Sequence, residues 1–123
     1  MYELTKQFRF DAAHTLEREI EVEGSRRIHG HSYRAEVTLR GRPDPQTGMI
    51  IDTGLLANKL AQVRDALDHR FLDEINDLGP GTMENLCAYI WRKLEDEIIT
   101  LHSVAVLRDS TEDRVTYYGG ATV

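Results

Sequence analysis

The stretch HGHSYRAEVTLRG, His29–Gly41, alternates between two kinds of side chain. Every second residue, starting at the first histidine, is a histidine or a largely apolar residue, and most of those between are polar or charged. A period of two is typical of a strand with one buried face. The sequence therefore predicts a strand whose buried face carries His29, His31, Tyr33, Ala35, Val37 and Leu39.

An earlier stretch, LTKQFRFDAAH, has the same period over residues 4–14 and ends on a third histidine, His14. The intervening residues, 15–25, are mostly polar and charged, and we interpret them as a loop. If the two strands pair as a β-hairpin, the three histidines meet on one face of the sheet. That face of the first strand carries Leu4, Lys6, Phe8, Phe10, Ala12 and His14.

Two amphipathic helices and two further strands follow along the chain. Asp52 with Thr53, and later Thr82, are suitable helix caps. The apolar stripes behind these caps are Leu56, Leu60, Val63 and Leu67 in the first helix, and Leu86, Ile90, Leu94 and Ile98 in the second.

The segments SVAVLRD and RVTYYGG predict two closing strands joined by a short turn at residues 111–113. The order ββααββ predicts an α+β fold, a four-stranded antiparallel sheet with two helices on one face, as one domain over residues 1–123. The open edges of such a sheet favour pairing between subunits.

Composition narrows the classes of partner. The 123 residues carry a net charge of −6, which argues against nucleic acid as a partner. The apolar runs are too short to span a membrane, and the first residues lack the apolar core of a secretion signal. A single cysteine, Cys87, excludes an internal disulfide, so we expect a cytoplasmic protein.

The three histidines point to a metal. Three imidazoles with an open fourth position are typical of catalytic Zn²⁺, so we expect Zn²⁺ on His14, His29 and His31. Asp68 and His69 are neighbours in LDHRF and form a suitable acid–base pair, although the local sequence alone favours an ordinary polar helix end.

Several motifs in this order resemble the 6-pyruvoyl-tetrahydropterin synthase family, which includes the 6-carboxy-tetrahydropterin synthases of queuosine biosynthesis. The resemblance covers nearly the whole chain. The motifs are FRFDAAH and RIHGHSY for zinc, GMIIDTGLL before the first helix, LDHRFLDEI, and GTMENLCAYIW, in which Gly81 stands where the family has proline.

The resemblance implies the tunnelling fold (T-fold), in which trimers stack into hexamers with active sites at subunit interfaces. It implies zinc on the three histidines and 7,8-dihydroneopterin triphosphate as substrate, with 6-carboxy-5,6,7,8-tetrahydropterin as the favoured product. It also implies that Asp68 and His69 move protons and that Thr82 and Glu84 bind the pterin.

Two positions depart from the family. Ser25 stands where the family has its proton-moving cysteine, and a serine hydroxyl is a poor base without help. Glu21 or Glu23, in the same loop, could replace it, as in the branch that makes 6-hydroxymethyl-dihydropterin, or they are solvated loop charges. A homologue that binds pterin without turnover is a third reading, and Cys87, inside a helix, is no assured substitute.

The second departure concerns the glutamate that anchors the pterin. Asp109 is aligned with it, which shortens the carboxylate by one methylene, and Glu112 is an alternative three residues further on. A carboxylate suits this role because it accepts two parallel N–H bonds.

Overall fold

Two long antiparallel strands form the centre of the sheet. The structure, a computed structural model, describes residues 1–120. Strand β1 (Tyr2–His14) pairs with β2 (His29–Gly41) without interruption, from Tyr2 opposite Gly41 to His14 opposite His29. The predicted hairpin and its buried faces are therefore confirmed, because the alternating apolar positions of both strands lie in the core.

The sheet has five strands, in the order β3-β1-β2-β4-β5. Strand β4 (Leu101–Arg108) pairs with β2, and β5 (Asp113–Tyr117) pairs with β4, both antiparallel as predicted. The prediction of four strands was wrong by one: β3 (Arg70–Phe71) runs parallel to β1 beside Ala12 and Ala13. Two residues are too few to show a period of two, so this strand has no signature in the sequence.

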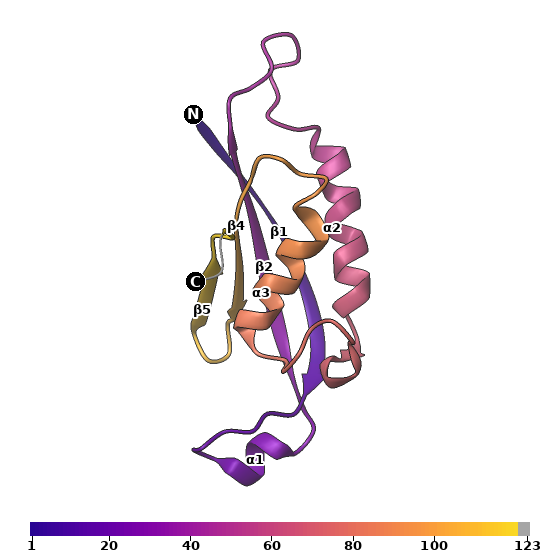
Figure 1. Ribbon diagram of the computed structural model, residues 1–123, viewed down its shortest axis with the longest axis vertical. Coiled ribbons are helices and arrows are strands. Elements are labelled where there is room, and N and C mark those ends of the chain that lie inside the picture. Colours follow the sequence, from indigo (N-terminus) through magenta and orange to yellow (C-terminus); the bar gives the residue numbers. More distant parts are fainter. Residues whose placement is uncertain (121–123) are drawn as a thin grey trace.

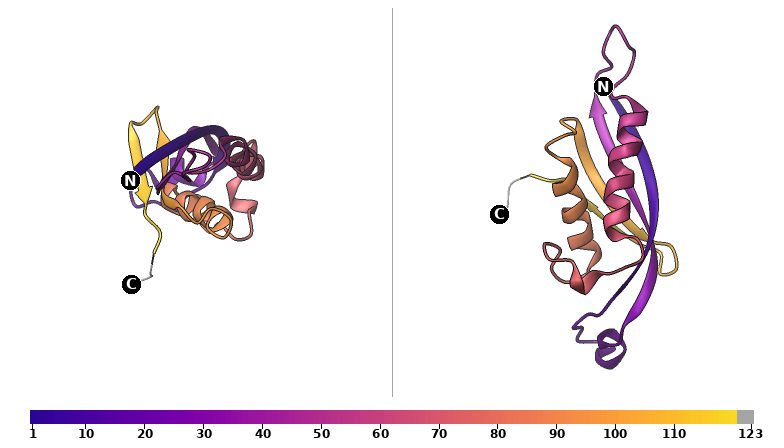
Figure 2. Two further views of the ribbon diagram at one scale, coloured as in Figure 1. Left: turned by 90° about the horizontal axis from the view of Figure 1, so that it is seen from above. Right: turned by 90° about the vertical axis from the view of Figure 1, so that its right-hand side faces the viewer.

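Helices α2 (Thr53–Leu67) and α3 (Met83–Leu94) cover one face of the sheet (Figures 1 and 2). Both predicted caps are present: Asp52 accepts a hydrogen bond from Gly54 N at 2.8 Å, and Thr82 Oγ1 accepts one from Asn85 N at 3.1 Å. The predicted apolar stripes of both helices are buried, with Ile98 lying just beyond the end of α3.

The segment between β1 and β2 is not wholly a loop, as the sequence had suggested. It contains a short helix, α1 (Val22–Arg26), which lies beyond the end of the sheet (Figure 1). Only Ser25 of this helix is buried, so the segment lacks the apolar stripe by which helices are recognised in a sequence. A 3₁₀ turn, η1 (Leu72–Glu74), follows β3.

Both outer edges of the sheet have unpaired backbone within residues 1–120. Along its outer side, β1 pairs only at Ala12 and Ala13, and β5 has no strand beyond it. Such edges are commonly covered or paired in native proteins. Among the described residues, no helix combines the length and the apolar character needed to cross a membrane.

Candidate functional site

The three histidines converge where the central hairpin ends. The register places His14 opposite His29, and His31 follows two residues along the same face of β2. The Nε2 atoms of His14 and His29 are 2.9 Å apart, and all three rings offer ligand atoms within 4.8 Å of one another. The sequence prediction that these side chains meet is therefore correct.

Hydrogen bonds fix the tautomers of two of the rings. His14 Nδ1 donates to the carbonyl oxygen of Gly81 at 2.7 Å, and His29 Nδ1 donates to that of Arg27 at 2.8 Å. A carbonyl only accepts, so both Nδ1 atoms carry the proton and both Nε2 lone pairs point into the cluster. Two facing lone pairs repel unless a cation lies between them. These backbone contacts are also the usual supports of metal-bound imidazoles.

The surroundings keep the rings of His14 and His31 neutral. Burial lowers the pKa of His14, and burial followed by the charge of Arg108 lowers the pKa of His31 to about 4. At neutral pH these imidazoles are therefore unprotonated, as metal binding requires. Three nitrogen donors with room for another ligand fit a catalytic Zn²⁺ site.

A cleft of about 300 Å³ opens beside His14. Its lining includes Thr82 and Glu84, both predicted from the sequence, together with Arg108 and Asp113. Thr82 is held there as the N-cap of α3, directly after Gly81, whose carbonyl binds His14. The start of α3 thus positions a hydroxyl and a carboxylate next to the histidines.

Asp109 lies on the opposite face of the sheet. Its carboxylate accepts a hydrogen bond from Arg34 Nη2 at 3.0 Å, and Arg34 alternates with the inward-facing Tyr33 on β2. The Arg34 hydrogen bond lowers the pKa of Asp109, which keeps the carboxylate ionised. Within one chain, the predicted anchor therefore does not share the cleft of His14, and Glu112 is exposed in the neighbouring turn.

Arg108 and Asp113 are site residues that the sequence reasoning missed. They are paired positions of β4 and β5, and Arg108 Nη2 donates to Asp113 Oδ2 at 2.9 Å. A signal was available: Arg108 shares the alternating phase of Val104 and Val106, whose side chains are buried under the helices.

The predicted Asp68–His69 pair exists, at the edge of the sheet beside β1. Asp68 Oδ1 accepts a hydrogen bond from Asp11 N at 2.9 Å and lies 3.1 Å from His69 Nδ1. The backbone hydrogen bond from Asp11 is the main cause of a lowered pKa at Asp68.

His69 itself faces outward. Its side chain is 79% exposed, and its backbone has a φ of 58°, in the left-handed region that few non-glycine residues adopt. It lines a shallow hollow of about 630 Å³ that also reaches His31. Backbone strain of this kind is concentrated at functional sites.

Ser25 is buried in α1, and its hydroxyl donates to the carbonyl oxygen of Val22 at 2.9 Å. Glu21 and Glu23 are exposed on the same short segment. Cys87 is buried in α3, where burial raises the pKa of its thiol to about 12. The thiol is therefore protonated at neutral pH and is no substitute for a reactive cysteine.

The sequence profile described as "6-pyruvoyl tetrahydropterin synthase" matches residues 3–120. The chain is 37% identical over 118 residues to a 6-carboxy-5,6,7,8-tetrahydropterin synthase from Synechocystis, covering 90% of this chain and 89% of the relative. It is 32% identical over 98 residues to the human 6-pyruvoyl tetrahydrobiopterin synthase, covering 75% of this chain and 66% of that protein.

Solved structures agree on the fold. The 6-pyruvoyl tetrahydropterin synthase of Caenorhabditis elegans superposes with a TM-score of 0.85 at 29% identity, covering 97% of this chain and 96% of that one. The Plasmodium falciparum protein of the same description gives 0.70 at 19% identity, covering 95% and 98%. The α+β T-fold expected from the sequence is therefore confirmed, with the additional short strand β3.

Proposed function

The chain belongs to the 6-pyruvoyl tetrahydropterin synthase family, and on this basis we propose that it is a zinc-dependent lyase. Its substrate would be 7,8-dihydroneopterin triphosphate and its product 6-carboxy-5,6,7,8-tetrahydropterin. This is the reaction of the queuosine pathway. The observation that carries the proposal is the convergence of His14, His29 and His31, with two lone pairs directed at one point. The similarity to a 6-carboxy-5,6,7,8-tetrahydropterin synthase over 90% of the chain supports this product.

The residues of the site divide the chemistry. The three histidines would hold Zn²⁺, which supplies Lewis acidity to the hydroxyls of the substrate side chain. Thr82 and Glu84 would bind the pterin, since both line the cleft next to His14 and a carboxylate accepts paired N–H groups.

Proton transfer is assigned to Asp68 and His69. The carboxylate of Asp68 lies 3.1 Å from His69 Nδ1, so Nε2 would be the ring atom that exchanges a proton with a substrate. Because the side chain of His69 is 79% exposed, it would contact a substrate or a neighbouring subunit and not the core of its own chain.

A second subunit would complete the site. The unpaired edges of β1 and β5, together with the outward-facing His69, support a homo-oligomer, a trimer or a hexamer built from two trimers. In such an assembly Asp109, on the other face of the sheet, could contribute to a neighbour's pterin site while remaining outside its own.

A different product is the second candidate, and exposure of Glu21 and Glu23 favours it. These carboxylates precede the buried Ser25, whose hydroxyl is already engaged with Val22. Either glutamate could act as the base that the family's cysteine provides, and the product would then be 6-hydroxymethyl-dihydropterin. A pterin-binding protein without turnover is the remaining alternative.

One incubation separates these functions. Pure protein is mixed with 7,8-dihydroneopterin triphosphate and Zn²⁺, and the products are identified by mass spectrometry. We expect 6-carboxy-tetrahydropterin together with acetaldehyde and triphosphate. The hydroxymethyl product would instead establish the second candidate, and unchanged substrate that nevertheless binds would establish the third.

Substitution of Ser25 tests its role. Ser25→Ala is expected to change turnover less than about threefold, because a base contributes about 10²–10⁴-fold and an un-ionised hydroxyl supplies little of that. Ser25→Cys is expected to raise turnover by about tenfold or more, because a thiol ionises far more readily than a serine hydroxyl and can supply the base that the family's cysteine provides. Initial rates of product formation at saturating zinc are the measurement.

The matched control is Ser103→Ala, which removes another buried serine hydroxyl, on β4. A large loss in Ser25→Ala that Ser103→Ala does not show would mean that the serine itself moves the proton. An unchanged rate in Ser25→Cys, with normal zinc content, would mean that another residue acts as the base.

A further inference from the structure

Arg108 brings a positive charge to the three histidines. Its Nη1 lies 3.5 Å from His31 Nε2, and its side chain is only 20% exposed. A guanidinium is always charged and prefers planar oxyanions, so an imidazole ring at 3.5 Å is a weak partner for it.

Unsatisfied polar atoms gather at the same place. Among the described residues, the buried side-chain nitrogen and oxygen atoms without a hydrogen-bond partner are Tyr33 Oη and Arg108 Nε. The ring of Tyr33 makes an edge-to-face contact with that of His31, with the ring centroids 5.7 Å apart. Buried donors without partners are destabilising, and each such group calls for an explanation. An acceptor oxygen beside His31 would give the guanidinium of Arg108 the charged partner that it lacks on that side.

The charges around the cleft point to an anion. Asp113 binds Arg108 through Nη2, which leaves Nε unpaired and Nη1 directed at His31. The nearby Arg114 is already paired with Glu36 Oε1 at 2.7 Å. A divalent ion on the histidines would add a second positive centre next to Arg108. These like charges repel unless a negative group lies between them.

We propose that Arg108 binds an oxyanion of the ligand, a carboxylate or a phosphate, directly beside the histidine cluster. Arg108 thereby selects pterins whose side chain carries negative charge at this end of the cleft. The inference rests on the proposed function in taking a pterin as the ligand. It adds to that function a specificity-determining residue, identified by the guanidinium geometry of this chain.

Binding of paired ligands tests the proposal. Each pair contains a neutral pterin and the same pterin with an anionic group. The carboxylate pair is pterin and pterin-6-carboxylate, and the phosphate pair is neopterin and neopterin triphosphate. Affinities are measured from pterin fluorescence on zinc-loaded protein. Arg108→Gln is expected to weaken a charged member by about 10- to 100-fold, the contribution of a hydrogen bond to a charged group, while a neutral member changes less than about threefold. Arg108→Lys should recover part of the loss.

The control is Arg40→Gln, which removes the same charge near the far end of β2, where Arg40 pairs with Glu3. Zinc content is measured for every variant so that a lost metal is not mistaken for a lost anion site. A selective loss in the carboxylate pair identifies a carboxylate, and one in the phosphate pair identifies a phosphate. Equal losses for charged and neutral members, or none, overturn the proposal.

A pterin-free measurement keeps the two proposals separate. Inorganic phosphate and acetate are titrated against the zinc-loaded wild type and Arg108→Gln while the melting temperature is followed. A ligand that binds only the folded state raises this temperature with its concentration. Wild-type protein that binds no pterin but is stabilised through Arg108 would disprove the pterin function and retain the anion site. If neither anion stabilises the wild type and no pterin binds, both the anion site and the pterin function are disproved.

Discussion

Replacing His29 with alanine is expected to abolish metal binding and, with it, turnover. His29 contributes one of two Nε2 lone pairs that face each other at 2.9 Å, and two imidazoles alone do not make a catalytic zinc site. Loss of a group that merely supports a ligand reduces metal affinity about 10–100-fold, so loss of the ligand itself is expected to exceed about 100-fold.

Zinc per chain after dialysis, measured by elemental analysis, is the first readout for His29→Ala. Melting temperature with and without added zinc is the second, because the metal stabilises only a fold that binds it. His29 is half-buried and not part of the core cluster, so the variant should fold.

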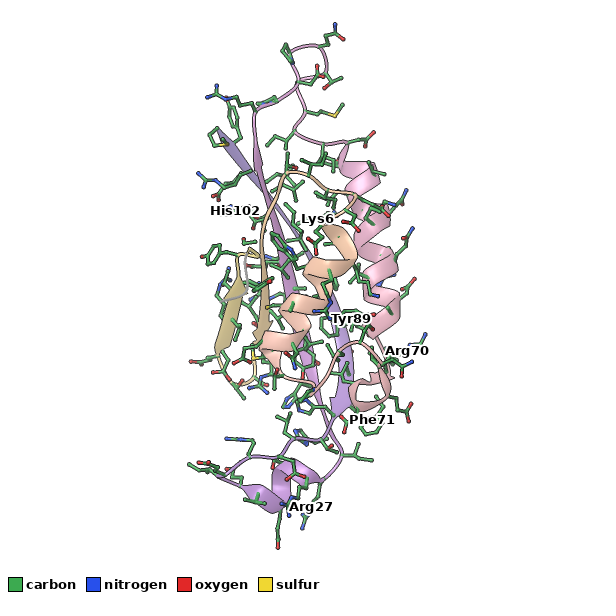
Figure 3. The ribbon with its side chains drawn as sticks, in the orientation of Figure 1. Lys6, Arg27, Arg70, Phe71, Tyr89 and His102 are labelled. Carbon is green, nitrogen blue, oxygen red and sulfur yellow. The ribbon has the colours of Figure 1, made fainter. Side chains whose placement is uncertain are left out.

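His102→Ala is the matched control for this substitution. His102 lies on β4, far along the molecule from Arg27, whose carbonyl supports His29 (Figure 3). It should retain full zinc content and full activity. Stoichiometric zinc in His29→Ala would contradict the assignment of the metal to the three histidines.

Replacing His69 with asparagine is expected to lower turnover by about 10²–10⁴-fold, the range of a general acid–base group, while zinc content and pterin affinity stay within about threefold. Asparagine is chosen because it tolerates the left-handed backbone that His69 adopts at φ 58°, so the loss reports the imidazole and not the turn. Steady-state rates, with separate binding titrations, distinguish the two effects.

Mixed oligomers test where the second half of the site comes from. His29→Ala removes the proposed metal ligand and His69→Asn the proposed proton-transfer group, so each variant alone is expected to have little activity. If His69 serves a neighbouring subunit, co-refolding the two variants creates some interfaces with both groups intact, and activity returns. Persistent inactivity of the mixture, beside normal recovery of refolded wild type, would place both groups in the site of one chain.

The central hairpin was predictable from the sequence because its side chains alternate over long stretches. The alternation runs through all 13 residues of β2, and that length determines which face is buried. Strand β3 and helix α1 were not predictable in the same way. Strand β3 has only two residues, and α1 has five residues with one buried side chain. Both elements are too short to show a hydrophobic period, and contacts with the rest of the fold hold them in place.

The site shows the same division. His14, His29 and His31 were predictable because an even spacing along each strand keeps side chains on one face. The face of the sheet on which Asp109 lies was not determined by the motif alone, since a shift of one residue along a strand moves a side chain to the opposite face. Outward exposure of His69 was also beyond the sequence, because it depends on the turn that follows α2.

At the end of the central hairpin, the position of the histidines and the identity of the residues in the connecting segment can change independently. His14 and His29 are partners in an unbroken backbone ladder, whereas Ser25 belongs to a protruding segment outside it. Insertions or exchanges in residues 16–26 therefore leave the ladder register unchanged. Residues of this segment, Ser25 among them, can therefore be exchanged while the three histidines keep the same arrangement. The hairpin thus maintains the proposed metal site, and the segment beyond it is where a different proton-transfer group could be introduced.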